Sequence, residues 1–171
     1  MPIIDLFAAE FNSEMANTRK ILERVPNDKL TWKPHDKNFT VQDLASHVAN
    51  LPFWTVPTLQ QDHLDFAPAG QPAFQTPKAE SQEQLLQFFD DNVSKAKAAM
   101  KGVTDEQMMT PWSLMAGGRI LFTMPRWVVQ RTFMMNHLIH HRAQLGLYLR
   151  LLGVAIPGMY GPSADDPRAP M

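Results

Sequence analysis

Residues 136–153 read NHLIHHRAQLGLYLRLLG, and three of the six histidines of the chain lie within the first six positions of this stretch. Its apolar residues recur every three or four positions, together with others upstream, which is the spacing of a helix with one buried face. Pro125 precedes the pattern at a position that tolerates proline, and Gly153 closes it. The sequence therefore predicts a long last helix whose stripe comprises Trp127, Met134, His137, Leu138, His141, Leu145, Tyr148 and Leu152.

Two histidines of this predicted helix are placed to act together. His137 and His141 are four residues apart, so their side chains leave the same face of the helix one turn apart. A helix commonly presents two imidazoles to one metal ion in this way. His140 is three residues from His137 and competes for that face, but His141 lies nearer to the apolar stripe. We therefore predict His137 and His141 as ligands and His140 as a supporting or surface residue.

Three further segments upstream have the helical period. The first occupies the start of the chain and ends at Pro26. The second begins at Thr40, a favourable N-cap, and Pro52 should kink or end it. The third begins at Ser81 and ends at Gly102. With the last helix, these segments predict four amphipathic helices.

The connections between the helices contain weaker signals. Residues 66–77 are rich in proline, alanine, glycine and glutamine, which predicts a long loop. Residues 104–108 predict one helical turn. Residues 112–115 and 119–122 flank a pair of glycines, which indicates either a small hairpin or an ordered loop before the last helix.

The predicted elements fit one domain. A chain of 171 residues can form one proper core, and four amphipathic helices favour an all-α fold of the four-helix-bundle class. The long connection between the second and third helices permits a crossover, so an up-down topology does not follow. From about residue 155 to residue 171 the chain is rich in proline and glycine, which predicts a tail or a wrapping loop.

A third histidine lies on the second predicted helix. His47 falls on its apolar face, between Leu44 and Leu51, and a bundle can bring it opposite the pair on the last helix. Alone, such a histidine is more often a hydrogen-bonded core residue than a ligand. Three neutral imidazoles with an open fourth position form the ligand set of catalytic zinc sites. We predict one divalent ion at His47, His137 and His141. Zinc or nickel is the first expectation, and iron or manganese would also suit the site if oxygen ligands were added.

Several other metal chemistries are excluded. A zinc protease helix needs glutamate directly after its first histidine, where this chain has Leu138. A di-iron bundle needs several inward carboxylates, which the stripes lack. The absence of cysteine excludes thiolate sites and disulfides. Asp43, one turn before His47, is a candidate to support that ligand, with helix capping as the alternative.

The numbers of acidic and basic residues indicate which kinds of partner the protein can have. Lys and Arg total 16 and Asp and Glu total 17, and no run of like charges occurs, so nothing indicates the basic face of a nucleic-acid-binding protein. No apolar stretch is long enough to span a membrane. The first ten residues have no basic region before an apolar core, so they do not read as a signal peptide. We expect a cytoplasmic protein with neither nucleic-acid nor membrane partners.

Several stretches resemble a known family. Residues 136–145 and 148–153 resemble the signature of the DinB family of damage-inducible four-helix-bundle proteins. Residues 39–48 and the Trp-Lys-Pro turn at 32–34 are also similar to the family, so the likeness covers nearly the whole chain. The family motif often has glycine where this chain has Ala143, a departure that does not touch the proposed ligands.

The resemblance implies more than the fold. It implies a mononuclear metal site of three histidines, which map onto His47, His137 and His141, and it implies a frequent homodimer. It also implies a shared superfamily with thiol-dependent transferases, such as bacillithiol transferases and mycothiol-dependent maleylpyruvate isomerases. The family name suggests a stress response.

Three functional hypotheses follow. The first is a metal-dependent S-transferase that uses a low-molecular-weight thiol and a small-molecule substrate. The second is a metal-dependent hydrolase, and the third is a non-catalytic metal-binding module. The third needs a closed site with a fourth protein ligand, for which the sequence offers no candidate. No residue can be named as an acid or base, although Trp54, Arg126 and Arg142 could line a pocket or simply pack.

Overall fold

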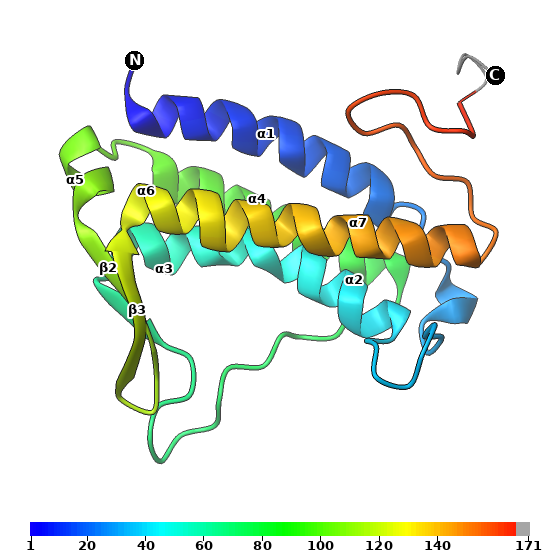
Figure 1. Ribbon diagram of the computed structural model, residues 1–171, viewed down its shortest axis with the longest axis horizontal. Coiled ribbons are helices and arrows are strands. Elements are labelled where there is room, and N and C mark those ends of the chain that lie inside the picture. Colours follow the sequence, from blue (N-terminus) through cyan, green and yellow to red (C-terminus); the bar gives the residue numbers. More distant parts are fainter. Residues whose placement is uncertain (167–171) are drawn as a thin grey trace.

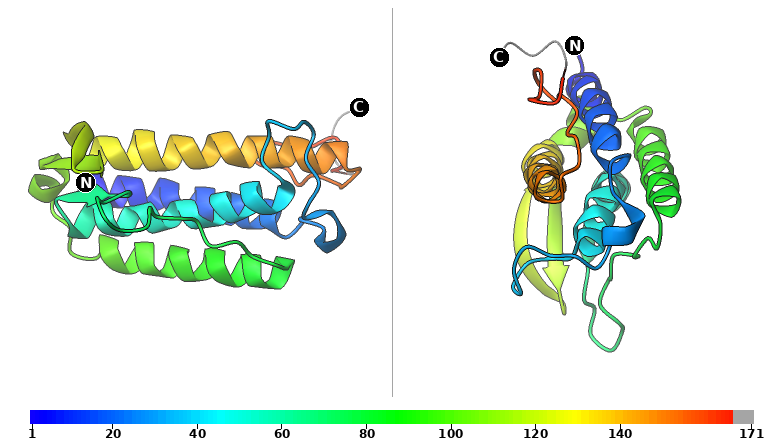
Figure 2. Two further views of the ribbon diagram at one scale, coloured as in Figure 1. Left: turned by 90° about the horizontal axis from the view of Figure 1, so that it is seen from below. Right: turned by 90° about the vertical axis from the view of Figure 1, so that its right-hand side faces the viewer.

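The computed structural model describes residues 1–166, and most of them lie in helices that run side by side (Figure 1). Helices α1 (Ile3–Leu22), α4 (Gln82–Met100) and α7 (Asn136–Leu151) are the longest. Helix α2 (Val41–Asn50) packs against both α4 and α7. Figure 2 shows the same arrangement from below and from the end. The prediction of a mostly helical fold is confirmed.

The predicted second helix is interrupted at its proline. Helix α2 ends at Asn50, a 3-10 turn follows over Leu51–Trp54, and α3 (Thr55–Gln60) continues the helical course. Pro52 has no backbone N–H to donate within a helix, so the chain changes its hydrogen-bonding pattern there. The expectation of a kink or an end at this proline is confirmed.

The predicted last helix contains an irregularity that the sequence did not predict. It begins as α6 (Arg126–Val128), continues as a π-helical stretch over Val129–Met135, and becomes α7 at Asn136. A π-helical turn contains more residues than an α-helical one, so this stretch shifts the faces of the helix relative to a strict 3.6-residue period. It occupies the two turns directly before His137.

A small sheet corrects the prediction of an all-α fold. Strands β2 (Pro111–Ala116) and β3 (Arg119–Pro125) form an antiparallel hairpin, which decides between the hairpin and the ordered loop. Gly117 and Gly118 both have positive φ angles, as a tight hairpin turn requires. Strand β1 (His63–Asp65) pairs with β2 in parallel, giving the order β1-β2-β3. Three residues are too few to show a strand period, so the sequence did not reveal β1.

The remaining connections agree with the sequence. Helix α5 (Asp105–Met109) is the predicted single turn, capped by the Thr104 hydroxyl, and a 3-10 turn over Asn27–Lys29 follows α1. Residues 66–80 form a long connection with neither helix nor strand. No helix in the described part of the chain is long and apolar enough to cross a membrane.

The main core forms where the helical stripes meet. Phe11 of α1, Leu44 of α2, Phe89 of α4 and Leu138 of α7 are each at most 1% exposed, one from each long helical segment. Burying side chains of this size stabilises the fold by roughly 1.5–3 kcal/mol each. A smaller cluster around Trp112 packs the sheet onto the helices. The core thereby fixes the rotation of α2 and α7 about their axes.

A buried ion pair joins α7 to α1. The Arg142 guanidinium contacts the Glu14 carboxylate at 2.6 Å and also donates to the Glu14 carbonyl and the Thr18 hydroxyl. Tyr160, from the segment after α7, accepts from Arg142 and donates to Glu14. The first part of the predicted tail therefore wraps back onto the helices, while residues 167–171 lie outside the described residues.

Candidate metal centre

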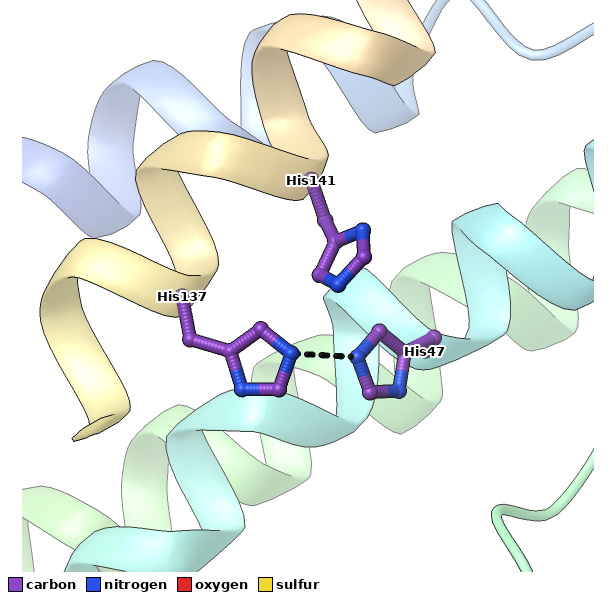
Figure 3. A group of neighbouring side chains, drawn as sticks. All are labelled: His47, His137 and His141. Atoms are coloured by element: carbon purple, nitrogen blue, oxygen red, sulfur yellow. Dashed lines mark hydrogen bonds between the residues drawn. The ribbon is translucent and has the colours of Figure 1, made fainter.

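The three histidines predicted as ligands meet between α2 and α7 (Figure 3). The Nε2 atoms of His47 and His137 are 3.1 Å apart, and the ring centroid of His141 lies 4.6 Å from that of His47. One nitrogen from each of the three rings can be chosen so that all lie within 4.8 Å of one another. The structure therefore brings together all three sequence-predicted residues.

Local packing explains why these rings converge. Leu44 of α2 and Leu51 at the start of the following 3-10 turn are buried on either side of His47, and on α7, Leu138 and Leu145 are fully buried. These leucines fix the faces that the two helices turn toward each other. The histidines lie at the edge of this packed surface and are only partly buried, so their nitrogens remain within reach of a ligand from solution.

Burial keeps the three imidazoles neutral. Desolvation, followed by repulsion from His141 and His137, lowers the pKa of His47 to about 4. Desolvation and the neighbouring histidines lower the pKa of His137 to about 4 as well. Desolvation also lowers the pKa of His141, although its hydrogen bond with Gln144 opposes this change. A metal ion needs deprotonated imidazole, so at neutral pH the nitrogen lone pairs are available.

Gln144 orients one of the rings. Its Oε1 atom lies 2.7 Å from Nδ1 of His141, and an amide oxygen only accepts, so Nδ1 donates and Nε2 keeps its lone pair. A polar partner on the distal nitrogen is the usual support of a metal-binding histidine. This role of Gln144 was not predicted from the sequence, although its position three residues after His141 on a helix is a signal that could have revealed it.

Removing this partner should weaken metal binding without removing a ligand. Gln144→Leu is expected to lower metal affinity by about 10- to 100-fold, because the His141 ring loses the acceptor that fixes its tautomer. Gln144→Glu keeps an acceptor oxygen at this position and should bind at least as tightly as the unaltered protein. Competition with a chelator of known affinity measures both variants. Equal affinities in Gln144→Leu and the unaltered protein would contradict the assigned role.

The other sequence-predicted candidates lie around the cluster or away from it. His140 is exposed and stands edge-on to the His141 ring, at a centroid distance of 4.9 Å, so it touches a candidate ligand. Asp43 instead contacts the Thr40 hydroxyl and pairs with Lys78 at 2.6 Å. Within residues 1–166, these contacts make Asp43 a helix cap and give it no bond to the three histidines.

The two arginines considered as pocket residues have structural partners instead. Arg126 is buried and donates to the carbonyls of Thr58 and Gln61, which joins the end of α3 to the start of α6. Arg142 is held by Glu14 beneath α7. Trp54 does lie beside the centre, as a neighbour of Phe133.

The donor set fits a divalent ion. Within residues 1–166 the cluster contains three imidazoles and includes no carboxylate. Neutral nitrogen donors of this kind suit zinc, nickel and related ions, and three of them leave at least one coordination position for a ligand that is not protein. The arrangement can therefore hold an ion and still admit a reactant.

Without metal, the cluster should make stability depend on pH. The folded-state pKa of about 4 for His47 and His137 lies below the ordinary 6.5, so the unfolded chain binds more protons between these values. The melting temperature of the metal-free protein should therefore fall as pH is lowered from about 6.5 to about 4. Carboxylates also titrate in this pH range. The test is therefore whether the melting temperature falls less in the double variant His47→Gln, His137→Gln. An identical profile in that variant would contradict the prediction.

Comparison with known proteins agrees with the resemblance in the sequence. The sequence model of the DinB family matches residues 2–170. A DinB-like protein from Bacillus cereus is 21% identical and superposes with a TM-score of 0.67, over 90% of this chain and 95% of that one. A DinB-like protein from Bacillus subtilis is 16% identical with a TM-score of 0.66, over 96% and 99%. Comparison with curated protein sequences gives no match. The family match spans nearly the whole chain, so this protein belongs to the DinB family.

Proposed function

We propose that the protein is a metal-dependent enzyme that acts on a small molecule with one divalent ion bound by His47, His137 and His141. The observation that supports this most strongly is the convergence of three neutral, half-buried imidazoles within 4.8 Å. No fourth protein ligand joins this cluster in the described part of the chain. A structural site would close its coordination shell with protein, so the open position favours catalysis over a non-catalytic module.

The reaction we favour is thiol transfer. When bound, a divalent ion at this site would lower the pKa of a coordinated thiol and so provide a nucleophile at neutral pH. The chain has no cysteine, so the thiol must come from a separate low-molecular-weight molecule. His47, His137 and His141 would supply the ligand nitrogens, and Gln144 would hold His141 in the required tautomer.

Hydrolysis is the alternative reaction, because the same open position would also admit water.

We also infer a four-helix bundle, in which α2 and α3 count as one interrupted helix and α6 and α7 as another. We further propose a cytoplasmic homodimer with a role in a stress response and with no nucleic-acid or membrane partner. These points rest on the resemblance to the family and on the balanced charge of the chain.

A panel of thiols tests the favoured reaction. The zinc-loaded and nickel-loaded protein is mixed with bacillithiol, mycothiol, glutathione or cysteine and with chlorodinitrobenzene as the electrophile. A new carbon–sulfur bond forms as chloride leaves, and the coloured product is measured. We expect turnover with at least one thiol that is absent in the metal-free protein and in His137→Ala. Metal-dependent cleavage of an activated ester, without turnover of any thiol, would instead support the hydrolase.

A further inference from the structure

Aromatic rings flank the three histidines on two sides. Phe39, in the segment before α2, has its ring centroid 6.2 Å from that of His47 and 6.4 Å from that of His141. Phe133, one turn before His137, lies 5.9 Å from the His137 ring. Phe39 is 51% exposed, so one side of its ring is open to solvent next to the histidines.

Beyond Phe133 the rings continue without a break. Trp54 and Phe122 each lie 5.3 Å from Phe133, and Phe74 lies 6.1 Å from Trp54 and stacks on Phe53 at 5.8 Å. These five residues, Phe53, Trp54, Phe74, Phe122 and Phe133, are called the aromatic row below. They come from four separate parts of the chain, and each pair of neighbours is within the distance at which aromatic rings attract each other.

The aromatic row lies at the edge of the core, where Trp54, Phe122 and Phe133 pack against the buried cluster around Trp112. Its members are partly exposed, and Phe74 is 42% exposed, whereas Phe11 and Phe89 in the main core are at most 1% exposed. Phe74 also lies in the long connection with neither helix nor strand, where a polar residue would leave the helices intact. A half-exposed apolar surface that adjoins polar ligand groups is typical of a small-molecule site.

The backbone places the row next to the histidines. Trp54 follows His47 by seven residues and ends the 3-10 turn between α2 and α3. Phe133 precedes His137 by four residues and lies within the π-helical stretch, an irregularity that is frequent at functional sites. The irregular segments next to α2 and α7 each provide an aromatic ring, and these two rings contact each other edge to face.

We propose that the substrate of this centre has an aromatic or similarly flat apolar group, which packs against Phe133 and Trp54 while its polar end reaches the metal. This inference rests on the proposed function, because the aromatic row gains a role in catalysis only if the histidines hold an ion. The only cation–ring contact within residues 1–166 is that of Arg142 with Tyr160, outside the row. The aromatic row provides ring faces and edges, which favour a flat apolar group.

Two metal-binding probes that differ only in this group test the proposal. Acetohydroxamate and benzohydroxamate have the same zinc-binding end, and only the second has a phenyl ring. Titration calorimetry with the zinc-loaded protein should show that benzohydroxamate binds at least about tenfold more tightly, a difference worth about 1.4 kcal/mol. In Phe133→Leu and in Trp54→Leu the ratio of the two affinities should fall, while acetohydroxamate binds as before. Leu147→Ala, at an exposed leucine of α7, is the matched control and should keep the ratio.

The outcomes separate this inference from the proposed function. Equal binding of both hydroxamates would overturn the inference and leave the metal centre intact. A preference for benzohydroxamate that persists in both variants would also overturn it. Binding of neither probe to zinc-loaded protein would count against an open metal site, and thus against both proposals. Phe74→Leu, at an exposed member of the aromatic row that contacts Trp54, provides a third variant if either of the others fails to fold, and it should also lower the ratio of the two affinities.

Discussion

Replacing His137 with alanine is expected to abolish stoichiometric metal binding. The unaltered protein should retain about one equivalent of zinc or nickel after dialysis. His137 contributes one of the three nitrogens of the cluster, and its Nε2 lies 3.1 Å from that of His47. Loss of a supporting partner alone typically weakens affinity 10- to 100-fold, so loss of a ligand should exceed about 100-fold. Elemental analysis of the dialysed protein measures the metal content.

A neighbouring histidine provides the control for that experiment. His140→Ala removes an exposed imidazole from the same helix, which touches the His141 ring but does not belong to the cluster. Its metal content should stay near that of the unaltered protein. If His137→Ala retains a full equivalent, or if His140→Ala loses as much metal as His137→Ala, the assignment of ligands is wrong.

The convergence of the histidines could be predicted because it depends on regular features. The four-residue spacing of His137 and His141 places both rings on one face of any helix, and the position of His47 among buried leucines turns it toward a packed neighbour. Neither argument requires knowledge of distant contacts. The mostly helical fold followed in the same way from local periodicity, and a pair of glycines indicated either a hairpin or an ordered loop.

The features that the sequence did not reveal depend on contacts between distant segments. Strand β1 exists because three residues pair with β2, about fifty positions away in the chain. The π-helical stretch before His137 has an apolar pattern that a 3.6-residue period also fits. Phe74 lies in a predicted loop, and only the folded chain shows that it stacks on Phe53 and contacts Trp54. The sequence could thus indicate the ligands but not the apolar surface next to them.

The largest effect on stability is expected from the ion pair beneath α7. Glu14→Gln keeps the size of the side chain but leaves the Arg142 guanidinium buried without an opposite charge. Removing one partner of a buried pair costs about 3–5 kcal/mol, whereas an exposed pair contributes about 0–1 kcal/mol. For a domain of this size, the melting temperature should fall by about 6–20 °C. Burial and Glu14 raise the pKa of Tyr160, so its hydroxyl stays protonated and donates to Glu14. Glu14→Gln weakens this hydrogen bond, so the segment that contains Tyr160 is expected to be less firmly held in the variant.

Two further variants show whether the buried charge, and not the lost contact, causes this effect. Glu10→Gln removes a carboxylate from the same helix, where Glu10 forms a partly exposed pair with Arg131, and should change the free energy of unfolding by less than about 1 kcal/mol. The double variant Glu14→Leu, Arg142→Met replaces both charges with apolar groups, which in other buried pairs is often neutral or stabilising. It should therefore be more stable than Glu14→Gln, as measured by chemical denaturation. If the double variant is the less stable of the two, then the hydrogen bonds of Arg142 to α1, and not the neutralisation of its charge, are what hold α1 and α7 together.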